Sequence, residues 1–223
     1  RAYVQSGRED QIIVMRQNSR AEMMSSVDRD QARLIKTHHL VACDEVGPLV
    51  TTDCVVSKQL PLRDGSGNLT VAVRGTTAAG IRMRSQVRLL RGRWFQAGLC
   101  EIAVPAKLMD RYAGLELGGS VTMQGRPWKI VGVFDGGGCA FDSELWTDVE
   151  DLLQAFHRYG TYSVALARLR SAEAAPAFIK DMAEDVRLKL EAKTEPVYFL
   201  EQSDTGRPMQ ILGQIITVIL TVG

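Results

Sequence analysis

The sequence predicts an α+β fold in which a discontinuous α/β domain is interrupted by a β-rich module. The first and last parts of the chain alternate strand-like and helix-like segments, in the orders βαβ and αβαβ. The part between them has short apolar runs separated by glycine-bearing turns. We therefore predict one domain made of residues 1–57 and 142–207, with residues 58–141 inserted into it as a second module.

The first part of the chain predicts a strand, a helix and two more strands. Gln11–Arg16 is rich in β-branched residues and predicts the first strand. Ser19 and Glu22 have the spacing of a capping box, so a helix is expected to follow, to about residue 36. Residues 38–43 and 51–57 are expected to be strands on either side of a Gly-Pro turn.

The middle of the chain predicts a mostly β module with a short helix near residues 107–112. Residues 124–127, Gln-Gly-Arg-Pro, predict a tight hairpin connection, because glycine takes positive φ without strain. The apolar runs that predict strands are residues 69–73, 100–104, 120–123 and 128–134.

Helical signals return in the last part. Thr147 and Glu150 have the spacing of a second capping box, followed by apolar residues at helical spacing. The remaining predicted elements are a strand over residues 163–169, a helix over 172–190 and a last strand over 196–200.

Charge and composition exclude several classes of protein. The formal net charge is +1, from 27 basic and 26 acidic residues, which gives no field to attract nucleic acid. The four cysteines lack CxxC spacing and the three histidines form no metal-ligand pattern, so no metal site is expected. A disulfide between Cys43 and Cys54 is possible because their predicted strands are neighbours, whereas Cys100 and Cys139 are expected to be free thiols.

The end of the chain, residues 208–223, is apolar and uncharged. A span needs about 20 apolar residues, so this run is too short to cross a bilayer. We interpret it as the start of a truncated transmembrane helix. Because the chain begins at Arg1 with no signal-like segment, we expect an extramembranous fragment between two spans. The alternative is an amphipathic helix that packs on the domain.

Two motifs suggest ligand-binding sites, but each is better explained by a structural role without a bound ligand. The glycine-rich run over residues 131–138 follows a strand but lacks the lysine and the helix of a phosphate-binding loop, so it predicts a strand-to-loop exit. An acidic cluster lacks the calcium-binding DxDxDG pattern. Its members are Asp142, Glu144, Asp148, Glu150 and Asp151. Because no serine or histidine has a catalytic setting either, we expect no enzyme activity, cofactor or metal.

Several segments, in their order and spacing, resemble one family, the periplasmic core domain of MacB-type (FtsX-like) ABC transporter permeases. The resemblance covers essentially the whole chain. The segments are Glu22–Ser26, Arg74–Gly75, Leu90–Arg93, Glu101–Val104, Leu117–Gly118, Val131–Trp146 and the terminal apolar run.

The resemblance implies a porter-like outer domain, which we expect nearest the membrane because both chain ends belong to it. It also implies a role in coupling cytoplasmic ATP hydrolysis to periplasmic motion. That motion would serve efflux, lipoprotein extraction or regulation of a partner. The implied partners are a second permease copy, a cytoplasmic ATP-binding subunit and a periplasmic adaptor or cargo. The implied location is the periplasmic side of the inner membrane. The alternative is an extracytoplasmic sensor or ligand-binding module of a receptor.

A mobile loop on such a domain is a candidate contact point for a partner. We expect its exposed side chains to make the contact, with Phe141 and Trp146 as aromatic anchors. Met23 and Met24, in contrast, are expected to fill the core. The candidate contact residues are Arg93, Asp135, Gly136, Gly137, Gly138, Phe141 and Asp142.

Overall fold

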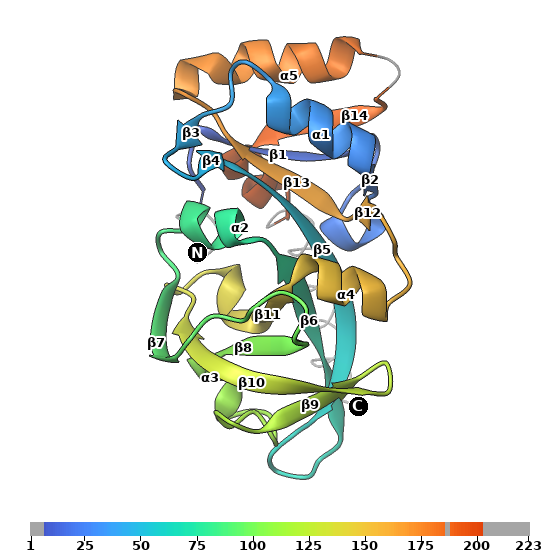
Figure 1. Ribbon diagram of the computed structural model, residues 1–223, viewed down its shortest axis with the longest axis vertical. Helices are drawn as coiled ribbons and strands as arrows, with labels where there is room; N and C mark the ends of the chain where they lie inside the picture. The colour runs from blue at the N-terminus through green and yellow to red at the C-terminus, as the bar shows by residue number, and fades with distance from the viewer. Residues whose placement is uncertain (1–6, 186–187, 203–223) are drawn as a thin grey trace, which may run out of the picture.

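One mixed sheet organises the whole molecule (Figure 1). The computed structural model describes residues 7–185 and 188–202, so the apolar segment 208–223 lies outside the described residues. Within them the sheet has ten strands. In spatial order they are β14 (Leu190–Thr194), β1 (Gln11–Arg16), β13 (Val164–Arg168), β5 (Val50–Pro61), β6 (Asn68–Thr76), β11 (Glu144–Asp148), β8 (Glu101–Pro105), β10 (Arg126–Asp135) and β7 (Arg88–Gly92), with β9 (Ser120–Met123) paired to β10.

The long strand β5 joins the two ends of the sheet. Its first residues, Val50 to Asp53, pair with β13, and the remainder, Cys54 to Pro61, pairs with β6. We call the part built on β14, β1, β13 and the start of β5 the outer half. The part built on the rest of β5, β6, β11, β8, β10, β7 and β9 is the inserted half. The predicted boundary at residues 57 and 58 therefore falls inside one continuous strand, and β11 lies between β6 and β8.

Short helices cover the sheet, and α1 and α5 lie over the outer half (Figure 1). The helices are α1 (Arg29–Thr37), α2 (Ala78–Met83), α3 (Ala106–Met109), α4 (Val149–Ala155) and α5 (Ala175–Glu184), with a further helical segment over residues 195–202. Three single 3-10 turns are Glu22–Met24, Ala140–Ser143 and Ala172–Ala174, and two small ladders pair β2 (Val27–Asp28) with β12 (Thr161–Tyr162) and β3 (Cys43–Asp44) with β4 (Gly47–Pro48).

The outer half of the sheet is buried on both faces. Ile12 and Val14 of β1 belong to the main core, together with Ile35 of α1 and Phe178 of α5. The alternate residues of β1, Ile13 and Met15, pack with Tyr198 and Phe199 of the segment 195–202. Successive side chains of a strand point to opposite faces, so the helices α1 and α5 and the segment 195–202 lie on opposite sides of β1.

The α+β fold class is confirmed, and so are most of the strands predicted for the middle of the chain. The predicted strand over residues 120–123 is β9, and the predicted hairpin joins it to β10. Gln124 and Gly125 both have positive φ, of 49° and 72°, as a two-residue hairpin turn requires.

The first helix begins later than the sequence predicts. Asp28 is its N-cap, in a capping box with Gln31, and the preceding Val27 and Asp28 pair with β12. This pairing excludes a helix that starts at residue 19. Met23 and Met24 consequently lie on an isolated 3-10 turn with half or more of their surface exposed, so the prediction that they fill the core is wrong.

The last predicted strand is also wrong. Residues 196–200 are helical, and the terminal strand is β14, which begins at Leu190, the last residue of the predicted helix, and covers residues for which no element was predicted. Helix α5 instead ends at Glu184, and β14 pairs with β1. Propensity favoured a strand for residues 196–200, but the burial of Tyr198 and Phe199 against the sheet decides the conformation.

Smaller corrections concern residues 38–43 and the second helix cap. Of residues 38–43 only Cys43 lies in a strand, at the start of β3, and Val41 makes one isolated bridge. The cap of α4 is Asp148, because the Thr147 hydroxyl donates to the carbonyl of Glu101 instead.

All four cysteines are free, so Cys43 and Cys54 form no disulfide. Cys43 is exposed on β3, whereas Cys54 is buried in β5. The prediction of free thiols at Cys100 and Cys139 is confirmed.

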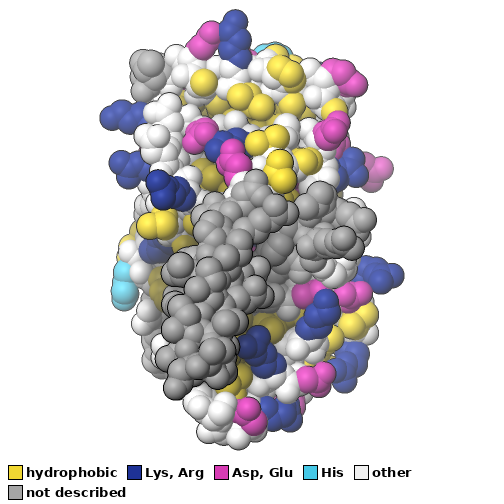
Figure 2. Space-filling model, turned by 180° about the vertical axis from the view of Figure 1, so that it is seen from behind, with side chains coloured by type: hydrophobic (Ala, Val, Ile, Leu, Met, Phe, Trp, Pro, Cys, Tyr) yellow, Lys and Arg dark blue, Asp and Glu magenta, His cyan; other side chains and the backbone are white. Residues whose placement is uncertain are grey.

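The surface carries mixed charges. Seen from behind, acidic and basic side chains are interspersed at both ends of the molecule (Figure 2). This pattern agrees with a formal net charge near zero. None of the helices in the part of the chain that the structure describes is long and apolar enough to cross a membrane.

Candidate functional site

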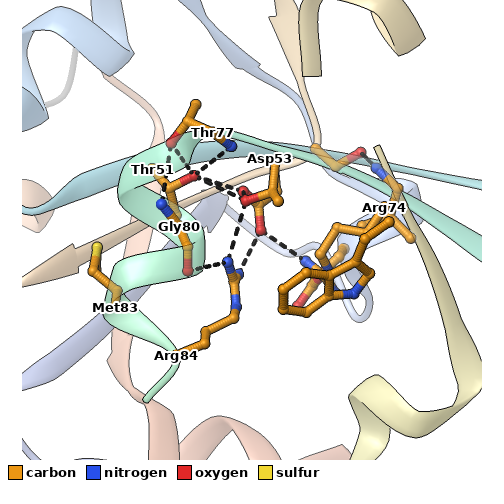
Figure 3. Close-up of polar contacts among 12 residues, drawn as sticks. Thr51, Asp53, Arg74, Thr77, Gly80, Met83 and Arg84 are labelled. Carbon is orange, nitrogen blue, oxygen red and sulfur yellow. Dashed lines mark hydrogen bonds and ion pairs between the residues drawn. The ribbon is translucent and has the colours of Figure 1, made fainter. Parts of the chain in front are cut away.

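A buried charge network lies where the outer half meets the inserted half (Figure 3). Its ionisable members come from the 3-10 turn, β5, β6, the end of α2 and β11. They are Glu22, Asp53, Arg74, Arg84 and Glu144.

Asp53 is the centre of the network and is 1% exposed. One carboxylate oxygen accepts hydrogen bonds from the hydroxyls of Thr51 and Thr76, at 2.8 and 2.7 Å. The other oxygen accepts from Arg84 at 2.5 Å and from Arg74 at 3.1 Å. Burial by itself would raise the pKa of Asp53, but the two guanidinium groups and the two hydroxyls outweigh it and lower that pKa.

Arg74 connects three carboxyl groups. It donates two parallel hydrogen bonds to Glu144, at 2.6 and 3.0 Å, and lies 2.7 Å from Glu22. Burial opposes its charge, but the surrounding carboxylates raise the pKa of Arg74 well above its ordinary value. Such bidentate pairs fix orientation as well as charge, so β6 and β11 are held in register by side chains as well as by their ladder.

Arg84 ties α2 into the network. Its Nη1 donates to the carbonyl of Gly80 at 3.1 Å and to the Thr76 hydroxyl at 3.2 Å. Its guanidinium carbon also lies 5.1 Å from the centre of the Phe141 ring and 5.5 Å from that of Trp146. A cation over aromatic faces is stabilised by the ring quadrupoles, so the two rings stabilise the charge of Arg84 in addition to its hydrogen bonds.

Two guanidinium groups in the network face three carboxyl groups. Glu22 is the carboxyl group that is least well compensated, since Arg74 is its ion partner while Glu144 and Asp53 lie near it with like charge. Burial, followed by these two carboxylates, raises the pKa of Glu22 in spite of Arg74. The pKa of Glu195, which begins the helical segment 195–202, is raised by burial in the same region.

The acidic cluster predicted from the sequence separates into individual structural roles. Asp148 caps α4, and Asp151 accepts from the backbone N–H groups of Gly98 and Cys100. Glu150 lies near Arg29, and Glu144 belongs to the network. Among residues 7–185 and 188–202, no three His, Cys, Asp or Glu side chains are grouped so that they could hold a metal.

Phe141 and Asp142 of the predicted contact loop are buried, at 5% and 6% exposed, which corrects the prediction that their side chains are available to a partner. Phe141 and Trp146 instead pack against each other and against Phe134 in an aromatic core. Asp142 accepts from the N–H groups of Gly136 and Gly138, at 2.8 and 3.0 Å, and lies 2.5 Å from Lys107. Its carboxylate therefore shapes the loop from inside.

The other predicted contact residues lie along the edge strand β7. Asp135 is paired with Arg88 at one end of the strand, next to the exposed Gly137 and Gly138, while Gly136 is buried. Arg93 follows the other end and makes a bidentate ion pair with Glu101. The structure thus places Arg93 and the loop at opposite ends of one exposed strand and does not bring them together.

Sequence reasoning missed the buried charge network. A signal was present, because Asp53, Arg74 and Glu144 are charged residues inside or beside apolar β-rich runs. Charged residues are almost never fully buried unless they are paired, so three such positions in neighbouring strands indicate mutual partners.

The family model for the MacB-like periplasmic core domain matches residues 1–185 of the chain. The chain belongs to this family. A MacB-like periplasmic core domain is part of an ABC transporter permease and lies on the periplasmic or extracellular side of the membrane. No curated protein gives a match to the chain.

Solved structures of domains from transporters and permeases share the fold at low sequence identity. The periplasmic region of MacB from Actinobacillus actinomycetemcomitans is 11% identical, with a TM-score of 0.63 over 91% of this chain and 95% of that one. The extracellular domain of the transporter YknZ from Gram-positive bacteria is 15% identical, with a TM-score of 0.57 over 82% of this chain and 100% of that one. A domain of a putative permease from Porphyromonas gingivalis is 16% identical, with a TM-score of 0.50 over 82% and 87%.

Proposed function

We propose that this domain transmits force in a permease of the MacB/FtsX type, so that cytoplasmic ATP hydrolysis moves a contact surface outside the inner membrane. Its partners would be a second permease copy, a cytoplasmic ATP-binding subunit and a periplasmic adaptor or cargo. The motion would serve efflux, lipoprotein extraction or regulation of a partner. The family match favours this function over the alternative of a receptor sensor.

The observation that carries the proposal is the connection between the two halves of the domain. Strand β5 runs through both without a break, and the charge network fixes α2, β5, β6 and β11 to one another at the crossing. Interiors of this kind are close-packed and transmit displacement instead of absorbing it. A displacement applied to the outer half would therefore be transmitted to the inserted half.

The contact surface that we propose is the exposed edge around β7. All five of its residues are exposed, and Leu90 has half of its surface in solvent. An edge strand presents unpaired N–H and C=O groups to a partner. Four residues of the predicted site flank this strand: Arg93, Gly137 and Gly138, which are exposed, and Asp135, which is partly exposed.

Distances between pairs of spin labels, measured by double electron–electron resonance in the assembled transporter, test the proposal. One spin label replaces Lys180 on α5, and the other replaces Thr122 on β9, in a background where Cys43 and Cys100 are serine. We expect the distance within one domain to be the same in nucleotide-free and ATP-trapped states, while the distance between Lys180 sites of two copies changes. The opposite result, a changing distance within the domain and a constant one between copies, would overturn force transmission by a rigid body.

A matched variant tests the role of the charge network. Asp53→Asn should broaden the distance distribution within the domain, because it removes the anion that both guanidinium groups share. Glu173→Gln, an exposed change on the 3-10 turn before α5, is the control and should leave the distribution unchanged.

A further inference from the structure

An open groove of about 540 Å³ lies between α1 and α2. Its lining comes from α1, from α2 and from Val50 and Thr52 of β5. The hairpin residues from Val46 to Pro48 form one side. Val46 is 75% exposed, so an apolar side chain stands free at the rim.

The groove is lined by four basic side chains and, among the described residues, by no acidic one. Three of them, Arg29, Arg33 and Lys36, come from α1, and Arg82 comes from α2. Two are compensated from outside the groove, since Arg29 lies 3.3 Å from Glu150 and Arg82 lies 3.0 Å from Asp44.

Arg33 and Lys36 are different. Both are exposed, and neither has an ion-pair partner within residues 7–185 and 188–202. The groove therefore keeps uncompensated positive charge, although the chain as a whole is near neutral.

The spacing of the cations indicates the shape of the anion that fits them. Positions 29, 33 and 36 lie on one face of the helix, and the row is about 10 Å long at 1.5 Å per residue. An extended peptide rises about 3.3 Å per residue, so acidic side chains at alternate positions are about 7 Å apart and can follow this row. A compact anion such as phosphate would reach only part of it.

The walls of the groove also contain apolar residues, namely Ala78 and Ala79 of α2 and Val46 and Pro48 of the hairpin. Every second side chain of an extended segment can point to these walls while the others point to α1. We propose that the groove binds an extended acidic segment of a partner protein, in which acidic and apolar residues alternate. This inference names the chemistry of a partner and so rests on the proposed function.

Binding of a short fluorescein-labelled peptide, in which glutamate alternates with valine, to the full chain tests the inference. The control peptide has glutamine in place of glutamate. We expect the acidic peptide to bind and the control not to bind. The affinity should fall steeply as salt is raised, because screening weakens interactions between exposed charges.

The double variant Arg33→Glu/Lys36→Glu should weaken binding about tenfold or more, a change of about 1.4 kcal/mol for each factor of ten. Glutamate has a helix propensity similar to that of arginine and lysine, so α1 should remain folded, which the melting temperature checks. The charge-matched control is Lys129→Glu/Lys180→Glu, at exposed positions on β10 and α5, and should bind as the unchanged chain does.

Two results would overturn the inference: no binding of the acidic peptide, or equal binding of that peptide by both double variants. If the peptide does not bind but vesicles of anionic phospholipid bind in a way that depends on Arg33 and Lys36, the groove recognises a membrane surface and the proposal of a protein partner is wrong. The distances described for the assembled transporter do not depend on this groove. Failure of peptide binding with constant distances within the domain would therefore reject the groove and leave force transmission in place.

Discussion

The guanidinium group of Arg84 donates to the carboxylate of Asp53 at 2.5 Å, and both side chains are almost completely buried. Arg84 follows α2, and Asp53 lies in β5 where this strand leaves β13 and begins to pair with β6. The ion pair therefore sits at the crossing between the two halves of the sheet. Breaking one partner of such a pair costs more than the pair contributes, because the remaining charge is left buried.

Asp53→Asn should destabilise the chain by about 3–5 kcal/mol, because Arg84 and Arg74 would then share a site without their common anion. Urea denaturation, at an unchanged m value, measures the loss. In the double variant Asp53→Asn/Arg84→Met the loss should be smaller than the sum of the two single losses, since one uncompensated charge is removed. Additive losses would show that the two residues do not act as a pair.

Glu22→Gln should change how stability depends on pH. The pKa of Glu22 is raised in the folded chain, whereas in the unfolded chain the carboxyl group has its ordinary pKa of about 4.5. Above that pH the unfolded chain releases the proton while the folded chain still holds it. The stabilisation is complete below that pH and is lost as the pH rises through the folded pKa. The variant, which has no carboxyl group at this position, should lose less stability than the unchanged chain between about pH 4.5 and pH 7.

Denaturation at a series of pH values measures this difference. Glu9→Gln, at an exposed position, is the control and should reproduce the slope of the unchanged chain. If Glu22→Gln gives that same slope too, Glu22 is ionised in the folded chain and the account of its pKa is wrong.

Gly80→Ala should destabilise the chain although alanine favours helices. A Cβ atom at Gly80 would lie 2.2 Å from the Thr76 hydroxyl and 2.8 Å from Nη1 of Arg84, so the methyl group would displace the network. Ala78→Gly, on the exposed side of the same helix, is the comparison and should cost at most about 1 kcal/mol from helix propensity. Thermal melts of the two variants show which of them loses more stability. A Gly80→Ala chain as stable as the original would show that the packing around Gly80 is loose.

The sequence predicted the strands of the inserted half better than the buried ion pairs that join them. β9 and its hairpin could be predicted because Gln124 and Gly125 are local determinants of a turn. The partners of Asp53 could not, because Arg74 and Arg84 lie 21 and 31 residues away and meet it only when β5, β6 and α2 have packed. Likewise, residues 196–200 have strand propensity, and burial of Tyr198 against β1 and β13, on the face away from α1 and α5, overrides it.

Phe141 and Asp142, in the predicted contact loop, also have a burial that local sequence could not predict. Glycines after a strand indicate an exposed loop, and that is correct for Gly137 and Gly138. The residues that follow return to the core because Trp146 and Phe134 provide an aromatic surface for Phe141. Only the tertiary structure shows that the chain turns inward after Gly138.

Asp142→Ala should release the loop that the buried carboxylate holds. The variant loses the acceptor for the N–H groups of Gly136 and Gly138 and the partner of Lys107, and a buried amide left without an acceptor costs about 1–3 kcal/mol. We expect faster hydrogen exchange at residues 136–138 with little change in β1 and β13, measured by mass spectrometry. Asp135→Ala is the control, because that side chain is partly exposed and holds only the N–H of Gly137 and Arg88. Equal exchange in the two variants would mean that Asp142 is not the residue that orders the loop.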